Sequence, residues 1–139
     1  MGVTLLDSGV IAGFLQRDDA LHRPAARAVR DAAAGGRLVA SVVTFAEVLT
    51  GARLGHHDEA IVRGFFRDVL ATVVTCTPDL AERAAAIRSD NRGLRLPDAV
   101  ILATGELHAD RIVTGDRRWT GVAGLGVSIQ LVGGPASAQ

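Results

Sequence analysis

The sequence predicts an α/β fold of three layers, in which one parallel β-sheet lies between helices on both of its faces. Short apolar runs typical of buried strands alternate along the chain with longer segments of helical periodicity. This alternation implies right-handed crossovers and therefore a parallel sheet. No internal repeat or linker divides the 139 residues, so we expect one domain over residues 1–132 and a fraying tail at 133–139.

Five short runs rich in β-branched and apolar residues are the predicted strands. The first ends abruptly at Asp7, where a carboxylate, a hydroxyl and a glycine follow an apolar stretch. Because a charge at the end of a buried strand is costly to desolvate, Asp7 must lie where water, a metal or a partner reaches it. The strands are expected at residues 3–6, 37–41, 72–76, 111–114 and 127–132.

Capping signals mark several of the predicted helices. Thr77 and Pro78 are typical of a helix start, because the hydroxyl caps the helix and proline suits its first position. Gly35 and Gly36 are typical of a helix end. The helices are expected at residues 8–16, 22–34, 44–54, 58–70, 77–91 and 97–109.

Composition limits the possible chemistry and compartment. The formal net charge is zero, so a polyanion would have to be held locally rather than by bulk attraction. All fifteen basic side chains are arginine, which excludes mechanisms that need lysine and supplies guanidinium groups suited to phosphate. The single Cys76 suits a reducing cytosol. No signal peptide or membrane span is evident, and we expect a cytoplasmic protein.

Four carboxylates follow strands or begin helices at comparable places. They are expected along the carboxyl edge of the sheet, where ligands bind in open α/β folds. Clustered carboxylates raise at least one pKa by repulsion unless cations neutralise them. An all-oxygen site suits Mg²⁺ or Mn²⁺, and such ions activate water and stabilise charge on a phosphodiester. The four acids are Asp7, Glu47, Asp98 and Asp116.

Each acid also has a purely structural interpretation. Thr44 and Glu47 match the S/T-x-x-E capping box, in which Glu47 would only stabilise its own helix. Asp98 is favoured by the helix dipole near a helix start. Asp7 or Ser8 would simply cap the helix that follows the first strand, and Asp116 would be an ordinary turn residue.

Taken together and in this order, four motifs resemble the PIN domain family, and within it the VapC-type toxins of bacterial toxin–antitoxin pairs. The resemblance extends over nearly the whole chain. The motifs are LLDS at 5–8, SVVTFAEV at 41–48, LPDA at 96–99 and VTGD at 113–116.

The resemblance implies a PIN-like ribonuclease domain whose parallel sheet has the strand order 3-2-1-4-5. It also implies metal-dependent RNA cleavage with Mg²⁺ or Mn²⁺. Many relatives have Asp-Thr-Ser at the first motif, whereas this chain has one hydroxyl fewer because Gly9 follows Ser8. Position by position, the catalytic and metal-binding acids would be Asp7, Glu47, Asp98 and Asp116, supported by Ser8 and Thr114.

The resemblance further implies partners. These are an RNA substrate, a VapB-like antitoxin whose peptide lies over the active site, and a second copy in a homodimer. Arg95, Arg117 and Arg118 are candidates for holding the RNA backbone, although a solvated surface charge is the simpler interpretation of each one.

The sequence leaves other functions open. A non-catalytic PIN-like module that binds RNA or protein is the main alternative to a nuclease. A signalling receiver domain would need a lysine, and a phosphatase with an aspartyl nucleophile would need an acid where Gly9 lies. His56 and His57 are interpreted as a hydrated loop between helices. Trp119 would stack on a base or, in the simpler interpretation, cover the edge of the sheet.

Overall fold

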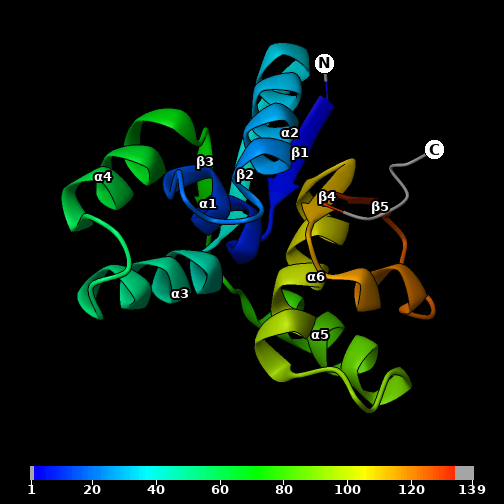
Figure 1. Cartoon of the computed structure of the whole chain (residues 1–139). Coiled ribbons are helices and arrows are strands. Elements are labelled where there is room, and N and C mark those ends of the chain that lie inside the picture. The colour runs from blue at the N-terminus through cyan, green and yellow to red at the C-terminus, as the bar shows by residue number, and fades with distance from the viewer. Residues whose placement is uncertain (1, 134–139) are drawn as a thin grey trace.

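The computed structural model describes residues 2–133. Its centre is a five-stranded sheet of order β3-β2-β1-β4-β5, in which every neighbouring pair is parallel (Figure 1). Leu5 in the central strand pairs with Val39 on one side and Ile112 on the other. The predicted fold class and strand order are confirmed. The strands are β1 (Gly2–Leu6), β2 (Gly36–Ser41), β3 (Thr72–Val74), β4 (Arg111–Thr114) and β5 (Ser128–Leu131).

Helices connect the strands and cover both faces of the sheet. The two short helical turns differ from the α-helices, because η1 has π-helical and η2 has 3₁₀ geometry. The elements are α1 (Ser8–Leu15), α2 (His22–Gly35), α3 (Val42–Arg53), α4 (Glu59–Gly64), η1 (Phe65–Val69), α5 (Pro78–Asp90), α6 (Leu96–His108) and η2 (Arg117–Gly121).

Two apolar clusters, one on each face of the sheet, make the three layers. Leu6 of β1 packs in a cluster with residues of α1 to α4. Leu5, its neighbour, packs in the other cluster with residues of α5 and α6. This division follows from the period of two along a strand, which points successive side chains to opposite faces. In Figure 1, α1, α3 and α4 lie on one side of the strands and α5 and α6 on the other.

The helix predicted at residues 44–54 begins earlier than expected. Ser41 is its N-cap, because the Ser41 hydroxyl accepts a hydrogen bond from the backbone N–H of Val43 at 3.1 Å. Helix α3 therefore starts at Val42, and Glu47 lies in its second turn rather than its first. This earlier start removes the capping-box interpretation of Glu47.

Two other predicted elements differ in detail. The helix expected over residues 58–70 is divided, because α4 is followed by the wider π-helical turn η1. The N–H of Leu70 closes this turn by donating to the Phe65 carbonyl. Strand β3 ends at Val74, two residues before the predicted end.

The predicted tail 133–139 lies outside the described residues apart from Gly133. Among the described helices, none combines the length and apolar character needed to cross a membrane.

Candidate active site

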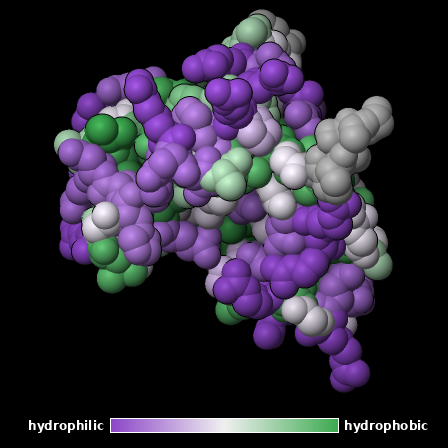
Figure 2. Space-filling model, viewed as in Figure 1, coloured by the Kyte–Doolittle hydropathy of each residue, from purple (hydrophilic) through white to green (hydrophobic). Residues whose placement is uncertain are grey.

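A cavity of about 540 Å³ opens at the carboxyl edge of the sheet. Its walls come from the first turn of α1, from α3, from the start of α6 and from the segment after β4. Figure 2 shows the surface hollowed between the α3 side and the α5–α6 side, with hydrophilic residues around the hollow. The cavity is lined by all four candidate acids, namely Asp7, Glu47, Asp98 and Asp116, together with Ser8 and Arg95.

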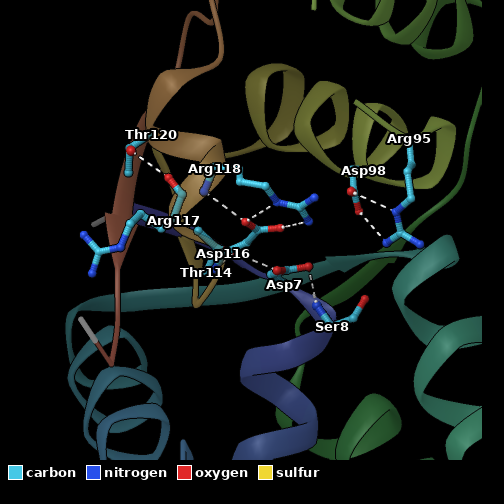
Figure 3. A network of polar contacts seen from close by, with 9 residues as sticks. All are labelled: Asp7, Ser8, Arg95, Asp98, Thr114, Asp116, Arg117, Arg118 and Thr120. Carbon is cyan, nitrogen blue, oxygen red and sulfur yellow. Dashed lines mark hydrogen bonds and ion pairs between the residues drawn. The ribbon is translucent and has the colours of Figure 1, made fainter. Parts of the chain in front are cut away.

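Asp7 is the most deeply placed of these acids. Only 8% of the residue is exposed, and its carboxylate accepts hydrogen bonds from the Ser8 N–H at 2.6 Å and the Thr114 hydroxyl at 2.8 Å (Figure 3). Burial raises the pKa of Asp7 to about 6, although these two hydrogen bonds oppose the rise. The nearby carboxylates of Asp98 and Glu47 add a smaller increase by repulsion. Asp7 therefore lies where a positive charge would be strongly favoured.

Ser8 connects the first motif to Glu47. Its hydroxyl donates to Oε1 of Glu47 at 2.5 Å and lies 3.1 Å from the hydroxyl of Thr44. Thr44 is fully buried. These contacts between α1 and α3 hold the Glu47 carboxylate next to Ser8, the residue that follows Asp7.

Asp98 is held in the first turn of α6, where it is 7% exposed. Arg95, the residue at the N-cap of α6, places its Nε 3.4 Å from one Asp98 oxygen and its Nη2 3.4 Å from the other. The Arg95 side chain is itself 65% exposed. Asp98 thus faces the cavity with an arginine of its own chain as counter-ion.

Asp116 is paired in the same way. Arg118 binds it through both oxygens, with Nη2 2.7 Å from Oδ2 and Nε 3.0 Å from Oδ1. Hydrogen bonding to Arg118 lowers the pKa of Asp116. The backbone N–H of Asp116 donates to the Thr114 hydroxyl at 3.0 Å, so Thr114 contacts both Asp7 and Asp116. Arg117 is exposed, and Figure 3 shows its guanidinium pointing away from the acids.

The sequence model of the family described as "PIN domain" matches residues 4–125, which include all four acids. The chain belongs to the PIN domain family. Comparison with curated protein sequences gives no match.

Solved structures of toxin–antitoxin complexes and of a VapC toxin have the same fold as this PIN domain. A toxin–antitoxin complex from Klebsiella pneumoniae is 28% identical, with a TM-score of 0.71 over 89% of this chain and 94% of that one. VapBC2 from Rickettsia felis, bound to a promoter DNA fragment, is 11% identical. Its TM-score is 0.72 over 94% of this chain and 98% of that one. VapC20 of Mycobacterium tuberculosis, described as a toxin that cleaves the sarcin–ricin loop, is 22% identical. Its TM-score is 0.67 over 90% of this chain and 98% of that one.

The acids of this PIN domain suit a hard cation by their chemistry. All donors are oxygens, as Mg²⁺ and Mn²⁺ prefer, and a cation would relieve the cost of burying ionised Asp7. Within residues 2–133, however, no three His, Cys, Asp or Glu side chains are arranged to hold a metal ion as they stand. Two of the four carboxylates are instead paired with arginine, Asp98 with Arg95 and Asp116 with Arg118.

Two residues line the cavity although nothing in the sequence indicated it. His57 does belong to a turn between helices, as predicted, but it also lines the cavity and is half-buried. Trp119 is 2% exposed and packs in the cluster of α5 and α6 while lining the same cavity. Its burial favours the covering role over stacking on an exposed base. Neither position has a local sequence signal, because both result from turns that fold back toward the sheet edge.

Proposed function

We propose that this PIN domain is a metal-dependent endoribonuclease that acts as the VapC-type toxin of a toxin–antitoxin pair. The observation that carries the proposal is the convergence of Asp7, Glu47, Asp98 and Asp116 on one cavity. Four separate segments of the chain supply these acids. Residues that only cap their own helices would not all have to line the same cavity. The likeness to VapC20, described as cleaving the sarcin–ricin loop, supports the same reaction class.

Mg²⁺ or Mn²⁺ held by the four acids would lower the pKa of a bound water and stabilise the charge that develops on the phosphodiester. The protein's own part is to orient the acids: Thr114 fixes Asp7, and Ser8 fixes Glu47. Arg95 and Arg118 are exposed enough to exchange their carboxylate partners for RNA phosphates, which the planar guanidinium binds in the same two-pronged geometry. Arg117 is proposed only as a peripheral phosphate contact.

The proposed partners are an RNA substrate, a VapB-like antitoxin and a second copy of the chain, in the cytoplasm. The Klebsiella pneumoniae structure, a toxin–antitoxin complex 28% identical to this chain, supports an antitoxin partner. Co-expression with the antitoxin of the same operon, followed by size-exclusion chromatography with light scattering, tests both the complex and the dimer.

The test of the reaction is incubation of the purified protein with total cellular RNA, with Mg²⁺, with Mn²⁺ or with EDTA, and mapping of the cut ends. We expect discrete cuts with either metal, no cuts in EDTA, and loss of cutting by Asp98→Asn. Asp18→Asn, in an exposed turn and not among the residues that line the cavity, is the matched control. Cutting that survives EDTA or Asp98→Asn would contradict the proposal.

A second function, a PIN-like module that binds RNA or protein without cleaving it, is favoured by one observation. Arg95 and Arg118 neutralise two of the four acids within the chain itself. If those ion pairs persist in solution, RNA would bind without being cut and Mn²⁺ would not bind measurably. Isothermal titration with Mn²⁺ therefore separates the two functions.

A further inference from the structure

We propose that a second cavity, between η2 and the turn that joins α5 to α6 (residues 91–95), binds one unpaired base of the RNA next to the cleaved bond. This inference rests on the proposed ribonuclease function and adds to it a subsite that selects the sequence at the cut. Three observations support it. The cavity adjoins the acids, side chains of α5 and α6 hold its wall in place, and its lining combines apolar groups with arginines.

This second cavity adjoins the acidic site. Its volume of about 320 Å³ is near the lower end of the range for small-ligand sites in proteins, so it suits one base rather than a paired helix. Asp98 lines both this cavity and the larger one. Arg118 lines it as well, and Figure 3 shows the Arg118 guanidinium between Asp116 and Asp98. A base bound here would therefore belong to a nucleotide close to the bond that the acids cleave.

Hydrogen bonds from α5 and α6 hold the wall of the second cavity that η2 and the segment after it provide. Asn91, the C-cap of α5, donates from Nδ2 to the Ala123 carbonyl at 3.2 Å and accepts from the Ala123 N–H at 2.9 Å. Glu106 of α6 accepts from the N–H of Gly126 at 2.6 Å. The segment between η2 and β5 is thus tied to both helices. The cavity is therefore pre-formed, which lowers the cost of ordering when a ligand binds.

The lining of the second cavity suits a nucleotide. Leu94 and Val122 are half-buried and supply its apolar part, while Arg92 and Arg118 are exposed. Proteins recognise unpaired RNA bases by stacking them on aromatic rings or guanidinium planes and by hydrogen bonds to their edges. Among the described residues, no carboxylate forms an ion pair with Arg92. Arg92 also lines the adjoining hollow on α5 together with Arg88, so a phosphate next to the bound base would meet positive charge. Apolar groups and guanidinium groups together favour a nucleotide, because its base and its phosphate need both.

The experiment combines one change in the RNA with one change in the protein. RNA oligonucleotides that contain the mapped cut site are prepared intact, or with an abasic residue at one of the nucleotides that flank the cut. We expect the wild type to cut one of the abasic RNAs with a kcat/KM about tenfold below that of the intact RNA, the worth of one hydrogen bond at the upper end of its usual range. That position identifies the base that the cavity binds.

Gly93→Leu and Gly121→Leu fill the second cavity from its two sides. A Cβ at either glycine meets no atom within 4 Å, so the leucine enters open space. We expect each variant to cut intact RNA about tenfold less efficiently, but to cut that abasic RNA within about twofold of the wild type, because no base is left to displace. Damage to the fold or to the acids would slow both RNAs equally. Gly35→Leu is the matched control, since it adds a leucine in open space at the amino edge of the sheet, where β2 begins.

The outcomes separate the two levels of the proposal. A wild type that cuts every abasic RNA as efficiently as the intact one overturns the base site alone. The same holds if both leucine variants slow the two RNAs equally or slow neither of them. Leucine variants that cut both RNAs like the wild type, but no longer form a complex with the co-expressed antitoxin, would assign the cavity to a peptide and overturn the inference. A wild type that never cuts RNA overturns the ribonuclease function and this inference with it.

Discussion

Replacing Asp7 by asparagine should stabilise the metal-free protein at neutral pH, although it removes an acid of the candidate site. The pKa of Asp7 is raised by burial from its ordinary 3.8 to about 6. Between these two values the folded state binds more protons than the unfolded state, so the free energy of unfolding falls as pH rises through that range. Ionised Asp7 is thus a source of instability above pH 6 when no cation is bound.

The magnitude follows from the two pKa values. The gap between 3.8 and about 6 corresponds to roughly 3 kcal/mol once Asp7 is fully ionised. Asparagine keeps an acceptor for the Ser8 N–H but weakens the bond from the Thr114 hydroxyl, a loss of about 1 kcal/mol. The expected net gain for Asp7→Asn is therefore about 2 kcal/mol at pH 8, or a rise in Tm of roughly 6–8 °C.

Thermal unfolding in EDTA, followed by circular dichroism at several pH values from 4 to 8, measures the effect. The Tm of Asp7→Asn should lie slightly below that of wild type at pH 4, rise above it through pH 5–6, and keep a constant lead above pH 7. Asp18→Asn, in an exposed turn, should show no such profile. A pH-independent difference, or a variant less stable than wild type at pH 8, would refute the argument from burial.

Three further predictions concern other positions. Arg118→Ala frees the carboxylate it pairs with, so we expect Mn²⁺ to bind several-fold more tightly by titration calorimetry while the KM for RNA rises; weaker Mn²⁺ binding would contradict this competition. A methyl group at Gly105 would overlap Ile112 of β4, so Gly105→Ala should cost about 1–3 kcal/mol in urea unfolding, whereas Gly35→Ala, in open space, should cost little. Trp119 has a buried indole N–H without a partner among the described residues. Trp119→Phe should therefore destabilise the protein by less than about 1 kcal/mol, because removing that N–H offsets part of the lost packing, and a larger loss would show that the N–H has a partner in solution.

The sequence indicated where the four carboxylates lie because the signals for their positions are local. Asp7 ends an apolar strand, and Asp98 follows the proline that starts α6, so each position is readable within a few residues. The parallel sheet then brings strand ends to one edge, and this places the acids together without any further information. The order of the strands came from the resemblance to the PIN domain family rather than from periodicity, since no strand by itself specifies its neighbour.

The sequence failed where a residue's partner lies far along the chain. The capping-box interpretation of Glu47 is wrong because α3 already starts at Val42 with Ser41 as its N-cap, and the contact that holds Glu47 comes instead from Ser8, 39 positions earlier. Glu106 gives a similar case: nothing near it in the sequence indicates a partner, yet Arg83 of α5 and the N–H of Gly126 hold it half-buried. Such pairings depend on how helices pack against each other, which periodicity does not encode.

By itself, then, the sequence determined the layers of this PIN domain and the edge at which its acids gather, because burial and strand ends are properties of neighbouring residues. Only the tertiary structure decided which charges are neutralised, by pairing Asp98 with Arg95 and Asp116 with Arg118 while leaving Asp7 buried with two hydrogen bonds and no counter-ion. The physical reason is that the energy of a charge depends on its distance to water and to other charges, and those distances exist only once the chain has folded.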